Sequence, residues 1–151
     1  MDDGREFVRK LNFEDKSWRW VTFFCDFYTL LDQETRDKYD DNLLGLKPLN
    51  CGCEGKPHIK IGDTSYTLLS ESSVYRAIAA LCEAEGDYHL ALAFLMCVKS
   101  CIPPIPPSPT AKDFARLRGQ HKLVDEMIED ITKKIPNQRR NLLKEWKRYV
   151  V

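Results

Sequence analysis

A run of large apolar side chains near the N-terminus limits the folds that this chain can adopt. Asp15 can cap a helix that runs from about Ser17 to Leu31, and apolar residues occupy more than one face of it. Such a helix lies at the centre of a core or forms an interface, and in the second case Trp18 and Phe24 are candidate partner-binding residues. The apolar residues are Trp18, Trp20, Val21, Phe23, Phe24, Phe27, Tyr28, Leu30 and Leu31.

The remaining sequence predicts a mainly α fold. We expect a single helical domain over residues 1–151, a bundle of about six or seven helices with one small β-hairpin at residues 58–68. Gly62 precedes Asp63 between the two strands, and glycine at this position suits a type II′ turn. Residues 45–57 hold three glycines and two prolines and are expected to be irregular. The predicted helices span residues 5–11, 17–31, 33–44, 70–85, 88–101, 110–135 and 137–149.

Residues 72–105 carry a pattern of small, aromatic and turn residues at helix–turn–helix spacing. Ala91 allows two helices to approach closely, Gly86 permits a tight turn, and Pro103 ends the second helix. The segment resembles a tetratricopeptide repeat, which implies a 34-residue helical hairpin. It departs from that family at Cys82, Leu95 and Val98, and no second repeat flanks it, so a generic αα-hairpin is the alternative. The matching residues are Tyr75, Ile78, Ala79, Gly86, Asp87, Tyr88, Ala91 and Pro103.

Hydropathy and cysteine usage bear on the compartment. The sequence contains no stretch of about 20 apolar residues, so no membrane span is expected. The first residues lack the apolar core of a secretory signal. The six cysteines are therefore expected to be reduced thiols in a cytoplasmic or nuclear protein.

Four of the cysteines also permit a zinc site. Cys51 and Cys53 lie in the irregular segment, and Cys97 and Cys101 are one helical turn apart. Four sulfurs, or three with His58, would suit tetrahedral zinc. Because paired zinc ligands are usually separated by two to four residues, plain buried thiols are the first interpretation and zinc the alternative.

A proline run follows the second helix of the predicted hairpin. Five of the seven residues from Pro103 to Pro109 are proline, which favours an extended polyproline helix. Such a helix docks into aromatic grooves with little loss of entropy, although the run also serves as a stiff connector between helices. The candidate partner-binding prolines are Pro103, Pro104, Pro106 and Pro107.

Charge is divided unevenly along a chain whose formal net charge is zero. Residues 110–151 carry eleven Lys and Arg against six Asp and Glu. A basic C-terminal helix could grip phosphates, with Trp146 available for stacking, or its basic face could simply be solvated. The candidate nucleic-acid-binding residues are Lys133, Lys134, Arg139, Arg140, Lys144, Lys147 and Arg148.

Signatures of enzymes are nearly absent from the sequence. It contains no Gly-rich phosphate loop, no G-x-S-x-G, no H-E-x-x-H and no aspartate-rich metal motif. The leading hypothesis is a non-enzymatic adaptor, accessory or regulatory domain without a cofactor. It would bind other proteins through helical and proline-rich surfaces and could form homo-oligomers. The alternative is a zinc-stabilised accessory protein that binds nucleic acid through its C-terminal helix.

Overall fold

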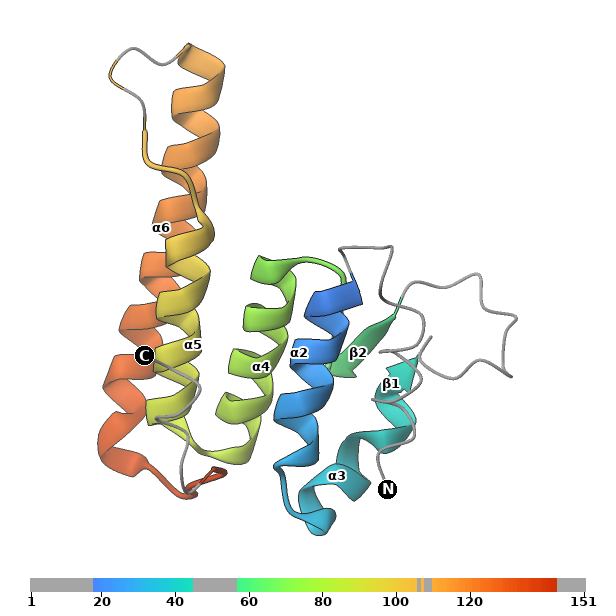
Figure 1. Cartoon of the computed structure of the whole chain (residues 1–151). Coiled ribbons are helices and arrows are strands. Elements are labelled where there is room, and N and C mark those ends of the chain that lie inside the picture. Colours follow the sequence, from blue (N-terminus) through green and yellow to red (C-terminus); the bar gives the residue numbers. More distant parts are fainter. Residues whose placement is uncertain (1–17, 45–56, 106, 108–109, 144–151) are drawn as a thin grey trace.

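The computed structural model describes residues 18–44, 57–105, 107 and 110–143 (Figure 1). The side chains of Trp18 and Leu44 lie outside the description. Two 3-10 turns, Asp40–Asn42 and Ile135–Asn137, join the regular elements. These elements are α2 (Trp18–Thr29), α3 (Gln33–Tyr39), β1 (Leu43–Leu44), β2 (His58–Ile61), β3 (Thr64–Thr67), α4 (Glu71–Glu85), α5 (Tyr88–Cys101) and α6 (Ala111–Lys134).

The mainly helical fold is confirmed, and within the described residues one predicted helix is shorter than expected and another is not formed. The described part of the chain contains five α-helices. The expected helix at 33–44 ends at Tyr39, and the expected helix at 137–149 is absent from its described portion, residues 137–143. The predicted helix at 5–11 and most of the irregular segment at 45–57 lie outside the described residues.

The hairpin is confirmed, and a short third strand extends it. β2 pairs antiparallel with β3, and β1 pairs with the other edge of β2. Gly62 has a φ of 61° and no described non-glycine residue has a positive φ, as a type II′ turn requires. Asn42 donates a hydrogen bond of 2.9 Å to the carbonyl of Lys60, which helps to draw the chain into the sheet where a longer helix was expected.

Four helices begin with a polar side chain that satisfies a free backbone N–H group. Asp32, Ser70, Asp87 and Thr110 each accept a hydrogen bond from the backbone nitrogen three residues further on. The cap at Thr110 lies at the predicted start of the helix at 110–135, and the backbone nitrogen of Asp113 donates the hydrogen bond to it.

The core lies between α2, the sheet and the α4–α5 hairpin. Phe24 and Val21 of α2 are fully buried, as are Ile78 of α4 and Leu90 of α5. Phe27 of α2 meets Phe94 of α5 edge to face, with ring centroids 5.8 Å apart. One face of the aromatic helix therefore belongs to the core.

Helix α5 holds α4 on one side and α6 on another. Ala91, fully buried on α5, gives α4 room to approach, as the sequence predicted. Figure 1 shows that the first turns of α6 extend beyond the end of α5. Among the described helices, none is long and apolar enough to cross a membrane.

The turn between α4 and α5 requires glycine for two reasons. Gly86 has a φ of 89°, and a Cβ built there would lie 2.9 Å from the Cβ of Arg139 and 2.6 Å from its Nε. A side chain at Gly86 would therefore be strained in the left-handed region and would also displace Arg139.

Replacing Gly86 with alanine tests this requirement. We expect Gly86→Ala to lower the free energy of unfolding by more than the roughly 1–2 kcal/mol cost of the left-handed conformation. Gly62→Ala is the matched control, because Gly62 also has a positive φ but an added Cβ meets no atom within 4 Å. Urea denaturation measures both, and equal losses would contradict the steric part of the argument.

Candidate docking groove between helices α4 and α6

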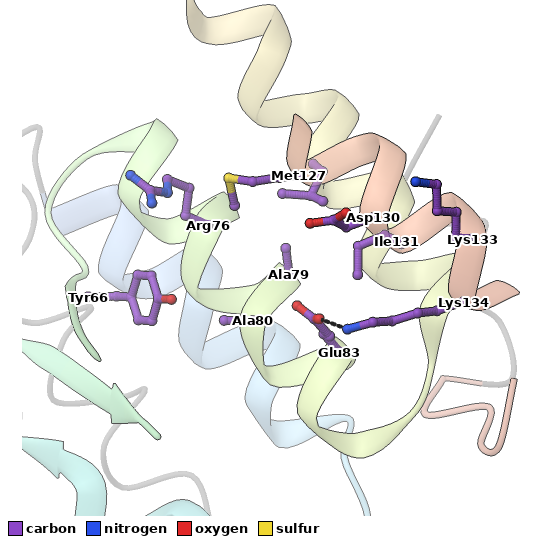
Figure 2. Close-up of a pocket in the computed structure, with 11 residues that line it drawn as sticks. Tyr66, Arg76, Ala79, Ala80, Glu83, Met127, Asp130, Ile131, Lys133 and Lys134 are labelled. Carbon is purple, nitrogen blue, oxygen red and sulfur yellow. Dashed lines mark hydrogen bonds and ion pairs between the residues drawn. The ribbon is translucent and has the colours of Figure 1, made fainter. Parts of the chain in front are cut away.

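A groove of about 350 Å³ lies between α4 and α6 (Figure 2). The two helices pack on α5 rather than along each other, and buried Leu95 of α5 also lines the space between them. Figure 2 shows Met127, Asp130 and Ile131 pointing from α6 toward α4. The remaining lining residues are Tyr66, Arg76, Ala79, Ala80, Glu83, Lys133 and Lys134.

Small side chains on α4 create the groove. The side chains of Ala79 and Ala80 each end at Cβ, so they do not fill the space between α4 and α6 that longer side chains would occupy. On α6, Met127 and Ile131 are separated by four residues and so share a face. Leu123 precedes Met127 by four residues on the same side and is 50% exposed. The apolar lining therefore continues along α6 beyond the groove.

One end of the groove is closed by an ion pair. Lys134 Nζ lies 2.5 Å from a carboxylate oxygen of Glu83, as the dashed line in Figure 2 shows. This hydrogen bond raises the pKa of the Lys134 ammonium. Because both side chains are about half exposed, the pair marks the end of the groove and contributes little to stability.

Two charges on the groove remain available to a ligand. Arg76 on α4 and Asp130 on α6 make no ion pair within the described residues, whereas Lys133 pairs with Glu129 at 3.3 Å. The groove thus offers an apolar floor, a cation on one wall and a carboxylate on the other.

The proline run lies at the opposite end of α5 from the α4–α5 turn. Pro103, Pro104 and Pro107 are exposed, while Pro106 lies outside the described residues. The carbonyl of Pro103 is 3.0 Å from Nε2 of His121 on α6, which ties the start of the run to that helix. Exposure leaves these prolines accessible to a partner.

Of the two aromatic partner-binding candidates on α2, the structure describes the side chain of one. Phe24 is fully buried in the core, so a partner cannot reach its ring without a rearrangement. The side chain of Trp18 is not among those described.

The basic candidates that the structure describes do not lie on one helix. Lys133 and Lys134 lie on α6, whereas Arg139 and Arg140 follow it in a non-helical segment. The candidates Lys144, Lys147 and Arg148 lie outside the described part of the chain.

Arg140 is bound by carboxylates from two distant parts of the chain. Its guanidinium donates to Glu85, to Asp32 at 3.1 Å and to the hydroxyl of Thr35 at 2.9 Å. Lys38 and Tyr39 complete the shell of Glu85 at 3.0 and 2.8 Å. Arg140 therefore joins α3 to the end of α4 and serves the fold.

Residues 138–142, which we call the strap, hold the α4–α5 turn. The backbone nitrogen of Arg139 donates to the carbonyl of Gly86 at 2.9 Å. Asp87, only 1% exposed, accepts from the Gln138 amide at 2.7 Å and from the Leu142 backbone at 2.9 Å. Sequence reasoning missed the strap, and the one signal for it was the acidic pair that flanks Gly86.

The cysteines give mixed support to the two interpretations made from sequence. Cys25 and Cys82 are buried, as expected for thiols that pack like small apolar residues. Burial and the nearby carboxylate of Glu71 raise the pKa of Cys101 to about 11 and also raise that of Cys97. Within the described ranges no three His, Cys, Asp or Glu side chains are grouped so as to hold a metal ion.

The other half of the predicted zinc site, Cys51 and Cys53, lies outside the described residues. The zinc hypothesis therefore remains a prediction.

Comparison with known proteins gives no match: no family model fits the sequence, no curated protein is significantly similar, and no solved structure is significantly similar.

Two substitutions compare the contribution to stability of the ion pairs made by the strap with that of the ion pair at the end of the groove. We expect Arg140→Met to lower the free energy of unfolding by about 3 kcal/mol, because it leaves part of a buried network uncompensated. Lys134→Met removes an exposed pair and should cost less than about 1 kcal/mol. Urea denaturation of both variants measures the two losses of unfolding free energy. Losses of similar size would show that Arg140 does not hold the fold.

Acid should weaken the same network. Burial raises the pKa of Glu85, but hydrogen bonds from Lys38 and Tyr39 and the charges of Lys38 and Arg140 outweigh it and leave the pKa below its usual value. Glu85 thus stabilises the fold above the unfolded-state pKa of about 4.3, and that contribution disappears as the pH falls through the lower folded-state pKa.

We expect the stability difference between the wild type and Glu85→Gln to shrink from pH 6 toward pH 3. Unfolding free energies measured at intervals over that range test the expectation. A difference that stays constant with pH would contradict the assigned role of the Glu85 carboxylate.

Proposed function

We propose that this chain is a non-enzymatic protein-binding domain that docks an amphipathic helix of its partner in the groove between α4 and α6. The observation that carries the proposal is the position of the groove: α4 and α6 both pack on α5 and leave between them a groove with apolar side chains at its floor and charged side chains around it. An amphipathic helix that lays its apolar face into such a groove is a recurring mode of protein recognition.

The dimensions of the groove suit a short helix. The apolar stripe of α6 runs from Leu123, which lies beyond the groove, to Ile131 within it, and Lys134 closes the other end. Eleven residues separate Leu123 from Lys134, which corresponds to about 16 Å along a helix. A ligand helix of about three turns would cover this length.

The charges of the groove define the ligand further. A carboxylate on one side of the ligand helix would meet Arg76, and a basic side chain on the other side would meet Asp130. Both groups lack an ion-pair partner in the described structure, so a ligand could pair with them without breaking an existing contact. These charges would set the orientation of the ligand more than its affinity.

Two further observations support protein binding over nucleic-acid binding. The exposed prolines and Ile105, which is 38% exposed, provide a second accessible surface at the far end of α5. Lys134 and Arg140, two residues of the nucleic-acid alternative, are already paired with carboxylates. Breaking those pairs would reduce the gain from phosphate contacts.

Selection from a displayed library of amphipathic three- to four-turn helices tests the proposal. We expect selected peptides to share an apolar stripe with one acidic and one basic flank. Ala80→Phe fills the groove and should weaken their binding at least tenfold, about 1.4 kcal/mol.

Ala84→Phe is the matched control for this test. Ala84 lies on the same helix, is exposed and does not line the groove, so binding to this variant should remain within about twofold of the wild type. Circular dichroism establishes that both variants are folded. Equal binding to a folded Ala80→Phe variant, or failure to select any peptide with this pattern, would refute the groove as the docking site.

A further inference from the structure

The charges of α6 are segregated along its length. The first twelve residues of the helix carry four basic side chains and one acidic side chain, whereas the last twelve carry four acidic and two basic ones. The first set comprises Lys112, Asp113, Arg116, Arg118 and Lys122. The second comprises Asp125, Glu126, Glu129, Asp130, Lys133 and Lys134.

Electrostatics within the helix do not account for this order. The helix dipole favours acidic residues in the first turns and basic residues in the last, and only Asp113, Lys133 and Lys134 follow that preference. Lys122 precedes Glu126 by four residues, which is the less favourable orientation for such a pair. The arrangement of the other charges therefore requires another explanation.

Packing within the described structure pairs six of these eleven charges. Asp125 pairs with Lys99 of α5 at 2.5 Å and Lys134 with Glu83 of α4 at 2.5 Å, and two exposed pairs form along α6 itself, Arg116 with Asp113 and Lys133 with Glu129. Lys122 and Glu126 have no ion-pair partner among the described residues and are both exposed. They are adjacent on the helix surface and carry opposite charges.

These two residues lie on the side of α6 that faces away from α5. Leu117, Val124 and Ile131 are the buried residues of α6 and repeat every seven positions. The opposite side, which we call the outer face, includes the exposed residues Ala115, Gly119, Lys122, Glu126 and Lys133. A Cβ added at Gly119 would meet no atom within 4 Å, so this face is open in the described structure.

We propose that the outer face of α6 binds the same face of a second copy of this chain, with the two helices antiparallel. In that orientation the basic half of each helix lies along the acidic half of the other. A two-fold axis that crosses the outer face at the level of Val124 along the helix places Lys122 opposite Glu126 of the second copy and repeats the pair by symmetry. Parallel pairing would instead place like charges side by side.

The outer face permits a close approach of the two helices. Ala115 and Gly119 lie one turn apart and project little beyond the backbone. With little apolar surface to bury, the association depends mainly on charge and should weaken as salt screens it. Lys122 and Glu126 do not line the groove, so variants at these two positions leave its lining unchanged. The two sites therefore fail or succeed independently.

Charge reversal in two separate chains tests the pairing. Sedimentation velocity over a concentration series at low salt should show dimers of the wild type that diminish at about 0.5 M salt. Lys122→Glu and Glu126→Lys should each abolish self-association, because each creates two repulsive pairs. An equimolar mixture of the two variants should form dimers again, because it restores both attractive pairs.

Lys60→Glu and Glu34→Lys are the matched controls. They make the same changes in net charge at exposed positions on β2 and α3, far along the chain from the outer face, and should dimerise like the wild type. Circular dichroism verifies that all variants are folded. A wild type that stays monomeric at every concentration, controls that lose association, or a mixture that stays monomeric would each overturn the proposal.

Discussion

The arrangement of the helices depends on two buried carboxylates at the α4–α5 turn. Glu85 and Asp87 flank Gly86, and together they bind groups from α3, from the start of α5 and from the strap. Buried carboxylates are tolerated only when hydrogen bonds replace their hydration, and here each oxygen has a partner. The turn thereby holds the strap, which follows α6 in the chain. It also sets the position of the C-terminal end of α6 beside α4.

That arrangement leaves α6 with surfaces of different chemistry. The side toward α4 is apolar at its centre and closed at one end by Lys134 and Glu83. The outer face is polar, and its charges are ordered along the helix. Since α6 has few buried residues and α5 covers one side only, a single long helix can present both surfaces without conflict.

Local signals explain what could be predicted from the sequence. The αα-hairpin, the β-hairpin and the Thr110 cap each depend on residues close together in the chain. Turn-forming and helix-capping residues can be recognised there from the sequence alone. The early end of α3 depends on strand pairing by Leu43, and the strap depends on carboxylates far away in sequence. Neither has a local signature.

The candidate site was harder to predict than the fold for the same reason. Ala79 and Ala80 are unremarkable in sequence, and they line a groove only because α5 keeps α6 apart from α4. The sequence pattern is compatible with Phe24 in the core or at an interface, and the burial of its ring in the structure places it in the core. The sequence pattern predicts a helix over 137–149 that carries Arg140, whereas Arg140 lies in a non-helical segment and binds Glu85.

The strap also has a consequence for the order in which the protein is assembled on the ribosome. Arg140 and Leu142 are each 55 residues beyond the carboxylates that they bind, which corresponds to roughly 3 to 11 s of translation. Until then Glu85 can already meet Lys38 and Tyr39, and one oxygen of Asp87 can cap α5. The nascent hairpin is thus held by partners made earlier, and residues 138–142 complete its contacts when they are synthesised.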